Sequence, residues 1–64
     1  MKNLTKKEIE ILRELSRGST DFEVAQVLNI SFETVKTHNK NIFKKLSVRN
    51  RSEAIREWFT AFLS

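Results

Sequence analysis

The sequence predicts an all-α fold, a compact domain of four helices. The chain contains no proline and only one glycine, and no stretch sustains the alternation of apolar and polar residues that is typical of a strand. Apolar residues recur instead at helical spacing, in segments separated by capping residues. A chain of 64 residues has room for one small core, so residues 1–64 are expected to form a single domain.

The first helix is expected at about residues 6–16. Thr5 and Glu8 have the spacing of a capping box, in which each side chain accepts a hydrogen bond from the backbone N–H of the other residue. Gly18 follows at the position where a left-handed residue would end the helix. The apolar stripe of this segment consists of Ile9, Leu12 and Leu15, with Ile11 beside it.

The second and third helices are expected at about residues 21–28 and 32–46. Thr20 or Asp21 would cap the short second helix, and Ser31 would cap the third. Two helices this close together, the second of them long and basic, are typical of a helix-turn-helix. A generic small helical bundle is the alternative, because it would show the same spacing.

The fourth helix is expected at about residues 51–63, where Asn50 and Glu53 have capping-box spacing at its start. Its apolar residues spread too widely around the helix for one buried stripe, so Phe59 and Leu63 should be partly exposed. An exposed aromatic edge favours a partner surface, unless the last turn covers the first helix. We expect dimerisation through this helix, with the contact residues Trp58, Phe59, Phe62 and Leu63.

The positive charge of the chain is concentrated in one segment. The formal net charge is +4 and the pI is about 9.9, which favours anionic partners. Residues 36–51 contain six basic residues and no acid, whereas the rest of the chain contains six basic and eight acidic residues. This basic segment coincides with the predicted third helix and the loop that follows it.

The predicted third helix has two different sides when its residues are placed at about 100° intervals. One side carries Val35, Ile42 and Leu46, which should anchor the helix in the core. The opposite side carries Glu33, Thr37 and three lysines four residues apart, Lys36, Lys40 and Lys44. Like charges at this spacing slightly destabilise an isolated helix, so we expect an interaction with another molecule to favour the three lysines. A polyanion would supply it, because neutralised phosphates release condensed counterions, whereas a merely solvated basic face is the alternative.

Other classes of function find little support in the residues. His38 lies beside the apolar stripe and is expected to be structural, and Asn39 on that stripe needs a hydrogen-bond partner or partial exposure. There is no cysteine, no second histidine and no Gly-rich phosphate loop, so we expect neither an enzyme nor a metal or cofactor. No apolar run approaches the roughly 20 residues that span a bilayer, and we expect a cytoplasmic protein without a membrane partner.

The chain resembles the LuxR/NarL-type (GerE-like) DNA-binding domain of bacterial transcription factors. The resemblance runs from Leu4 to about Ala61, through the segments LTKKEIEILRELSRGST, VAQVLNIS, TVKTHNKNIFKKLSV and RNRSEA. The third segment is the most specific. It has Val-Lys-Thr-His, an aliphatic residue four positions after the histidine, and then Lys-Lys-Leu.

This resemblance implies a domain whose third helix enters the major groove of double-stranded DNA. Carried over by position, the base or near-base contacts would be Lys36, Thr37 and Lys40. The phosphate contacts would be Thr34, Lys44, Arg49 and Arg51. The fourth helix would form a homodimer contact, and RNA polymerase is a further partner that the resemblance leaves open. Family members typically follow a regulatory domain, so the chain is either a stand-alone regulator or the output domain of a response regulator, with no small molecule bound here.

Four positions depart from the family pattern. Phe22 stands where a lysine that touches phosphate is common, and it cannot make that ionic contact. Asp21 replaces a common asparagine but can still cap, and Asn39 replaces a residue that is often apolar or basic. Ser47 stands where glycine is frequent, which carries a backbone cost if this residue is left-handed.

Two other functions compete with DNA-dependent transcription regulation. The chain could be a helical protein-interaction module that uses the aromatic edge of the fourth helix and carries its lysines for solubility. It could also be a promoter-binding module like region 4 of sigma factors, which shares the helix-turn-helix. The pattern VKTHNKNIFKKL favours the LuxR-type interpretation, sequence-specific binding of duplex DNA.

Overall fold

The computed structural model describes residues 3–63, without the side chain of Phe62. Its helices are α1 (Lys6–Ser16), α2 (Asp21–Leu28), α3 (Phe32–Leu46) and α4 (Arg51–Leu63), and their bounds coincide with the expected ranges. No strand occurs among residues 3–63. The prediction of an all-α fold with a central helix-turn-helix, formed by α2 and α3, is therefore confirmed.

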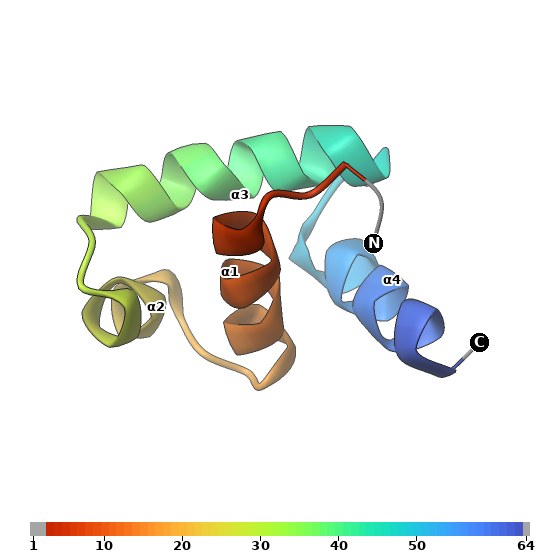
Figure 1. Cartoon of the computed structure of the whole chain (residues 1–64), viewed down its shortest axis with the longest axis horizontal. Coiled ribbons are helices and arrows are strands. Elements are labelled where there is room, and N and C mark those ends of the chain that lie inside the picture. The colour runs from red at the N-terminus through yellow and green to blue at the C-terminus, as the bar shows by residue number, and fades with distance from the viewer. Residues whose placement is uncertain (1–2, 64) are drawn as a thin grey trace.

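The helices are arranged around α1 and α3. Figure 1 shows α3 along one side of the molecule, with α2 beneath its beginning and α4 beneath its end. Helix α1 lies beneath the middle of α3 in this view and packs against all three other helices. In the described part of the chain α2 and α4 do not pack against each other, so α1 and α3 hold them in place.

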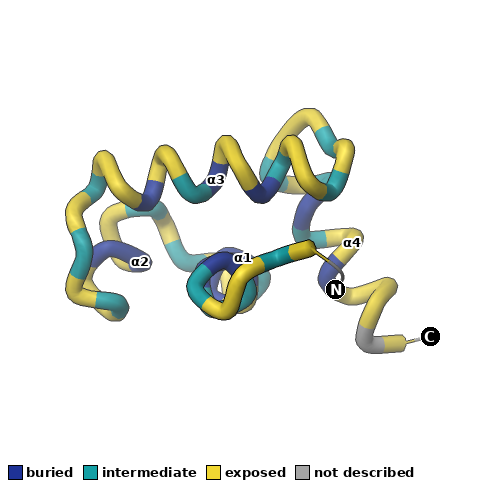
Figure 2. The backbone as a smooth tube through the Cα atoms, turned by 45° about the horizontal axis from the view of Figure 1, so that its top comes forward, coloured by how far each residue is buried: buried dark blue, intermediate teal, exposed yellow. Residues whose placement is uncertain are grey.

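The core lies between the inner side of α3 and the other three helices. Figure 2 shows the buried and half-buried residues of α3 on the side that faces α1, and exposed residues along its outer side. Full burial of one aliphatic side chain stabilises a fold by about 1.5–3 kcal/mol, so a few positions dominate so small a core. The buried apolar residues are Ile11, Leu12, Leu15, Val24, Ala25, Val35, Ile42, Ala54 and Trp58.

The predicted caps begin the first three helices. The Thr5 N–H donates to Glu8 Oε1 at 2.8 Å and the Glu8 N–H donates to Thr5 Oγ1 at 3.1 Å, which completes the expected capping box. Thr20, rather than Asp21, caps α2 in a second box with Glu23. Ser31 caps α3 as expected, and its Oγ accepts from the Thr34 N–H at 3.0 Å.

The start of α4 differs in part from the expected capping box. The Glu53 N–H donates to Asn50 Oδ1 at 3.0 Å, as predicted. The Glu53 carboxylate, however, accepts from the Arg49 N–H at 2.9 Å, one residue earlier than in a capping box. This bond holds the basic loop against the first turn of α4.

Three helices end at a residue with positive φ. After α1, Gly18 has φ 91°, and the Ser19 N–H donates to the Glu14 carbonyl at 3.2 Å, as in a Schellman motif. Asn29 and Ser47 have φ 55° and 56° and end α2 and α3 in the left-handed region. Ser47 therefore carries the backbone cost that the sequence suggested for a non-glycine residue at this position.

Replacement of Ser47 by glycine is expected to stabilise the domain. A left-handed residue with a Cβ costs roughly 1–2 kcal/mol, while glycine loses about 0.5–1 kcal/mol more conformational entropy on folding. The net gain should be about 0.5–1 kcal/mol, measured by urea unfolding. Ser47→Ala keeps the Cβ and is the matched control, and equal stability of the glycine and alanine variants would contradict this explanation.

An ion pair between the buried Glu8 and the partly exposed Lys45 joins the start of α1 to the end of α3. Lys45 Nζ near the end of α3 lies 2.8 Å from Glu8 Oε1 in the first turn of α1, and Glu8 is 3% exposed. Burial by itself would raise the pKa of the Glu8 carboxyl. The hydrogen bonds from Lys45 and from the Thr5 N–H outweigh it, and the net effect is a pKa below the ordinary value.

The lowered pKa of Glu8 makes the stability of the domain pH-dependent. The contribution is fully present above the ordinary glutamate pKa, and it is lost as the pH falls through the lower pKa of the folded state. Glu8→Gln should cost on the order of 1 kcal/mol near neutral pH, because the partner Lys45 is partly exposed, and it should flatten the acid side of the urea-unfolding profile. Glu10→Gln, on the surface of α1, is the control and should leave that profile unchanged.

Candidate nucleic-acid interface

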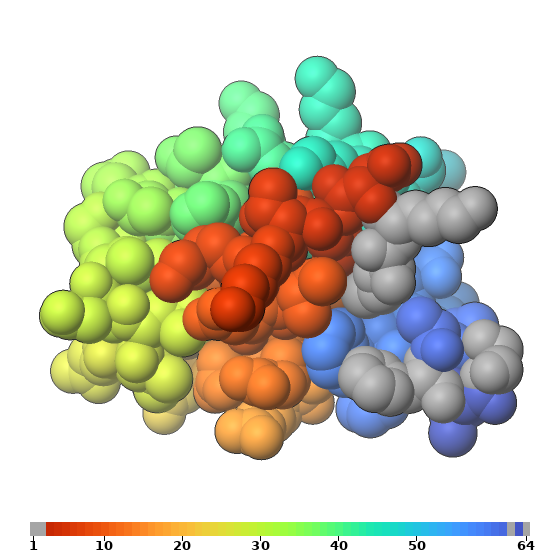
Figure 3. Space-filling view, in the orientation of Figure 1, coloured from red at the N-terminus to blue at the C-terminus, as the bar shows by residue number. Residues whose placement is uncertain are grey.

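The outer side of α3 presents a ridge of polar side chains. The ridge is formed by Lys36, Thr37, Lys40 and Lys44, all of which are exposed. Figure 3 shows side chains of the green part of the chain, which is α3, projecting beyond the upper edge of the molecule. The opposite side of the helix is fixed in the core by the fully buried Val35 and Ile42. Burial of one side therefore sets the direction in which the ridge points.

The side chains of the ridge differ in their surroundings. Among the described residues, Thr37, Lys40 and Lys44 have no side-chain hydrogen bond or ion pair, so their polar groups are available to a ligand. Lys36 has a neighbour, because its Nζ lies 5.4 Å from the centroid of the Phe32 ring. Electrostatically, the ridge is a row of positive charge at one-turn intervals, and no carboxylate among the described residues is paired to it.

The expected phosphate contacts fall into two groups. Thr34 and Arg49 are exposed near the two ends of α3, and Lys44 belongs to the ridge itself. The Thr34 hydroxyl lies 2.7 Å from the hydroxyl of the capping residue Ser31, so it already has a local partner. Arg51, in contrast, takes part in a network within the domain.

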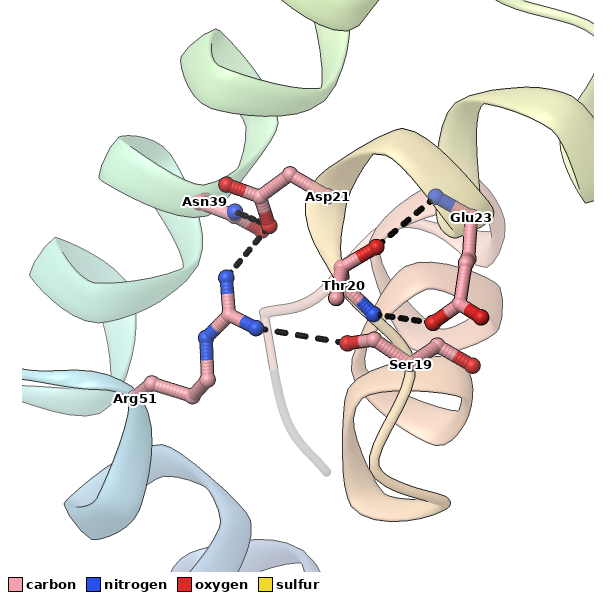
Figure 4. Close-up of polar contacts among 6 residues, drawn as sticks. All are labelled: Ser19, Thr20, Asp21, Glu23, Asn39 and Arg51. Carbon is pink, nitrogen blue, oxygen red and sulfur yellow. Dashed lines mark hydrogen bonds and ion pairs between the residues drawn. The ribbon is translucent and has the colours of Figure 1, made fainter.

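Arg51 links the beginning of α4 to the beginning of α2. Its guanidinium forms an ion pair with the Asp21 carboxylate and donates to the Ser19 carbonyl at 3.3 Å. Figure 4 shows the guanidinium reaching both partners, with the Asn39 amide directed at the same Asp21 oxygen as Arg51. Because Thr20 caps α2, the Asp21 carboxylate is free for this role. The side chain of Arg51 is 40% exposed, and its phosphate contact stays a prediction.

Asn39 completes the network from the inner side of α3. It is 7% exposed, and its Nδ2 donates to Asp21 Oδ1 at 3.0 Å, which is the hydrogen-bond partner that a polar residue on the apolar stripe requires. Its Oδ1 is buried and has no hydrogen-bond partner in the described part of the chain. The sequence indicated that Asn39 needs either a hydrogen-bond partner or partial exposure, but it did not indicate Asp21 or Arg51, which lie on other helices.

A shallow hollow runs along one side of α3 between the ridge and this network. Its volume is about 330 Å³. The lining residues are Asp21, Lys36, Asn39, Lys40, Phe43 and Arg51. Three of these side chains are cationic and one is anionic, so the hollow extends the positive surface from α3 toward the start of α4.

Phe22 has a structural partner that the sequence did not reveal. It is 67% exposed at the start of α2, and its ring stacks on Phe32 with a centroid separation of 4.2 Å and an interplanar angle of 13°. The position where the resemblance implied a phosphate-contacting lysine thus supports the beginning of α3 instead. Aromatic residues ten positions apart gave no periodic signal, because the turn between α2 and α3 brings them together.

The predicted dimerisation residues of α4 divide between the core and the surface. Trp58 is buried with Ala54, so its ring is part of the core. Phe59 is 48% exposed and Leu63 is 86% exposed. The side chain of Phe62 lies outside the described residues. Among the described side chains, Phe59 and Leu63 therefore form the exposed part of the predicted dimer surface.

The fold and the basic ridge define a helix-turn-helix domain suited to a polyanionic partner. Residues 2–58 match the family model described as bacterial regulatory proteins, luxR family. The chain belongs to this family, whose members are DNA-binding transcriptional regulators rather than enzymes. The resemblance inferred from the four sequence segments is thereby confirmed.

Individual relatives carry the same kind of description. The chain is 47% identical over 51 residues to the nitrate/nitrite response regulator protein NarP of Escherichia coli (strain K12), covering 80% of this chain and 24% of that protein. It is 50% identical over 52 residues to the CsgBAC operon transcriptional regulatory protein of the same strain, covering 81% and 24%. The transcriptional regulatory protein LiaR of Bacillus subtilis (strain 168) is 46% identical over 52 residues, covering 81% and 25%. The chain thus spans about a quarter of the length of these relatives.

Within the described residues, no helix combines the length and the apolar character needed to cross a membrane.

The Asp21–Arg51 pair should contribute measurably to stability because it joins two helices that do not otherwise pack together. A double-mutant cycle with Asp21→Ala and Arg51→Ala should give a coupling energy of about 1 kcal/mol by urea unfolding, reduced by the partial exposure of both groups. The pair Lys7 and Glu10, which lies within one turn of α1 with its charged atoms 3.9 Å apart, is the control and should give less than about 0.5 kcal/mol. Equal coupling in the two cycles would contradict a specific role for the network.

Proposed function

We propose that this chain binds duplex DNA sequence-specifically, with α3 in the major groove, and thereby regulates bacterial transcription. The observation that carries the proposal is the exposed ridge of Lys36, Thr37, Lys40 and Lys44 on a helix whose opposite side is held in the core. Family membership supports the same conclusion, because the relatives are DNA-binding regulators.

The dimensions and chemistry of α3 suit this groove. A helix of 15 residues is about 22 Å long at 1.5 Å per residue, and the major groove, about 12 Å wide, admits one helix. Lysine donates to the guanine acceptors O6 and N7, while the hydroxyl and methyl of threonine contact base edges or a thymine methyl. We assign base or near-base contacts to Lys36, Thr37 and Lys40.

Phosphate contacts would flank these residues. Lys44 and Arg49 extend the positive surface beyond the end of the base-contacting segment, and Thr34 lies at its beginning. Arg51 borders the same hollow as Lys36 and Lys40. A phosphate there would share the guanidinium with Asp21, so Arg51 should contribute less to affinity than Lys44.

Dimerisation through α4 would complete the recognition unit. Phe59 and Leu63 supply exposed apolar surface on the helix that lies farthest from α2. A helix-turn-helix dimer reads two half-sites roughly one helical turn, about 10 base pairs, apart. Selection of bound sequences from a random duplex pool would reveal paired half-sites at such a spacing if the chain binds as a dimer.

A protein-interaction module is the second candidate, favoured by the 86% exposure of Leu63. The two functions differ in their response to DNA at low salt. Tight self-association or partner binding without any electrophoretic shift of duplex DNA at low salt would favour the interaction module over the proposed function.

The affinity for duplex DNA should fall steeply with salt concentration. Each neutralised phosphate contributes a slope of about −0.9 in a plot of log K against log salt concentration, and Lys44→Ala should reduce the total slope by about one contact. Arg13→Ala removes an exposed cation from α1, away from the ridge, and should leave the slope unchanged. A flat salt response of the wild-type protein would exclude this mode of binding.

Lys36→Ala and Lys40→Ala should relax sequence specificity. Loss of a base contact costs about 1–3 kcal/mol for the preferred site and equalises the affinities for different bases at one position. Binding assays with single-base variants of the selected site would locate that position. Equal losses on every sequence would instead assign these lysines to phosphates.

A further inference from the structure

A stacked aromatic pair lies where the two helices of the helix-turn-helix begin. Phe22 is the second residue of α2 and Phe32 is the first residue of α3. Their ring planes are within 13° of parallel, with centroids 4.2 Å apart, which is a close aromatic stack. Two thirds of the surface of Phe22 nevertheless stays in water, so the burial of Phe22 in the core does not explain the pair.

The same Phe32 ring has a cationic neighbour in the recognition ridge. Lys36 follows Phe32 by four residues, one helical turn later on the same side of α3, and its Nζ lies 5.4 Å from the ring centroid. This distance is within the roughly 6 Å over which an ammonium group is attracted to an aromatic face. Lys40 and Lys44, farther along the ridge, have no such ring contact among the described residues.

The two contacts form a chain of support from α2 to the ridge. Phe32 is a first-turn residue whose ring is only half-buried, so the core alone does not fix its orientation. Stacking against Phe22 restricts the ring, and the ring in turn restricts the ammonium of Lys36. A long lysine side chain otherwise loses substantial rotamer freedom when it binds, and prior restriction lowers that loss.

We propose that Phe22 and Phe32 are positioning residues for base recognition: their stack holds the Lys36 ammonium at the start of the ridge and sharpens discrimination at the base pair that Lys36 contacts. This inference rests on the proposed function. It also gives Phe22 a role in sequence specificity, although its uncharged side chain cannot neutralise a phosphate. The stack affects the orientation of one donor and leaves the number of phosphate contacts unchanged.

The first test uses the free protein and needs no DNA. Nuclear magnetic resonance of lysine-labelled protein should show the ε-methylene protons of Lys36 shifted upfield by the Phe32 ring, relative to those of Lys40. Phe32→Leu should abolish the shift, Phe22→Leu should diminish it, and Phe22→Tyr should retain it. Identical shifts for Lys36 and Lys40 in the wild-type protein would overturn the proposal, whatever the protein does with DNA.

The second test measures discrimination. Lys36→Ala first locates the base pair that Lys36 contacts, and the measured quantity is the affinity for the selected site divided by the affinity for a site altered at that base pair. This ratio should fall about two- to fivefold in Phe22→Leu and Phe32→Leu, which is the range expected from an exposed cation–π contact. Phe22→Tyr should keep the wild-type ratio. The slope of log K against log salt concentration should stay unchanged in all three variants, in contrast to Lys44→Ala.

Several results would overturn the inference. An unchanged or increased ratio in both leucine variants would show that the stack does not assist Lys36 or that the ring withholds it from DNA. Thermal unfolding of each variant separates a loss of folding from a loss of positioning. Phe22→Leu alters a mostly exposed residue and keeps the test decisive if Phe32→Leu fails to fold.

Absence of any duplex binding by the wild-type protein would overturn the proposed function itself, whereas an unchanged ratio in a protein that binds overturns this inference alone.

Discussion

The burial of the inner side of α3 is the interaction on which the rest of the molecule depends. Val35 and Ile42 are completely buried against a core supplied by the other helices, chiefly α1 and α2. In a domain this small, a few such side chains provide most of the apolar stabilisation. They also fix the rotation of α3 about its own axis. The repulsion among the ridge lysines is tolerated because the opposite side of the same helix is held so firmly.

The basic residues of the segment 36–51 serve different purposes despite their closeness in sequence. Lys45 stabilises the fold through Glu8, and Arg51 joins α2 to α4 through Asp21. Lys36 lies over an aromatic ring, while Lys40 and Lys44 are free among the described residues. Net charge alone therefore overstates the positive surface available to DNA, since two of these cations already have carboxylate partners within the domain.

Much of the fold followed from local chemistry. The caps at Thr5 and Ser31, the left-handed Gly18 and Ser47, and the bounds of the helices all depend on residues close together in the chain. The ridge on α3 was also predictable, because helical periodicity alone decides which residues share a side. Asp21 shows where such reasoning ends. It was expected as a possible cap, but Thr20 takes that role and Asp21 instead accepts from Asn39 and Arg51.

By itself, then, the sequence determined the four helices, the family and the residues that α3 presents, because these depend on periodicity, caps and a distinctive segment. Tertiary structure decided the partners across helices: Asn39 with Asp21, Lys45 with Glu8, Phe22 with Phe32, and Trp58 with the core. Each of these contacts joins residues that are ten or more positions apart or lie on different elements. Their distances depend on how the helices cross, and helix crossing is set by the packing of the whole core rather than by any local pattern.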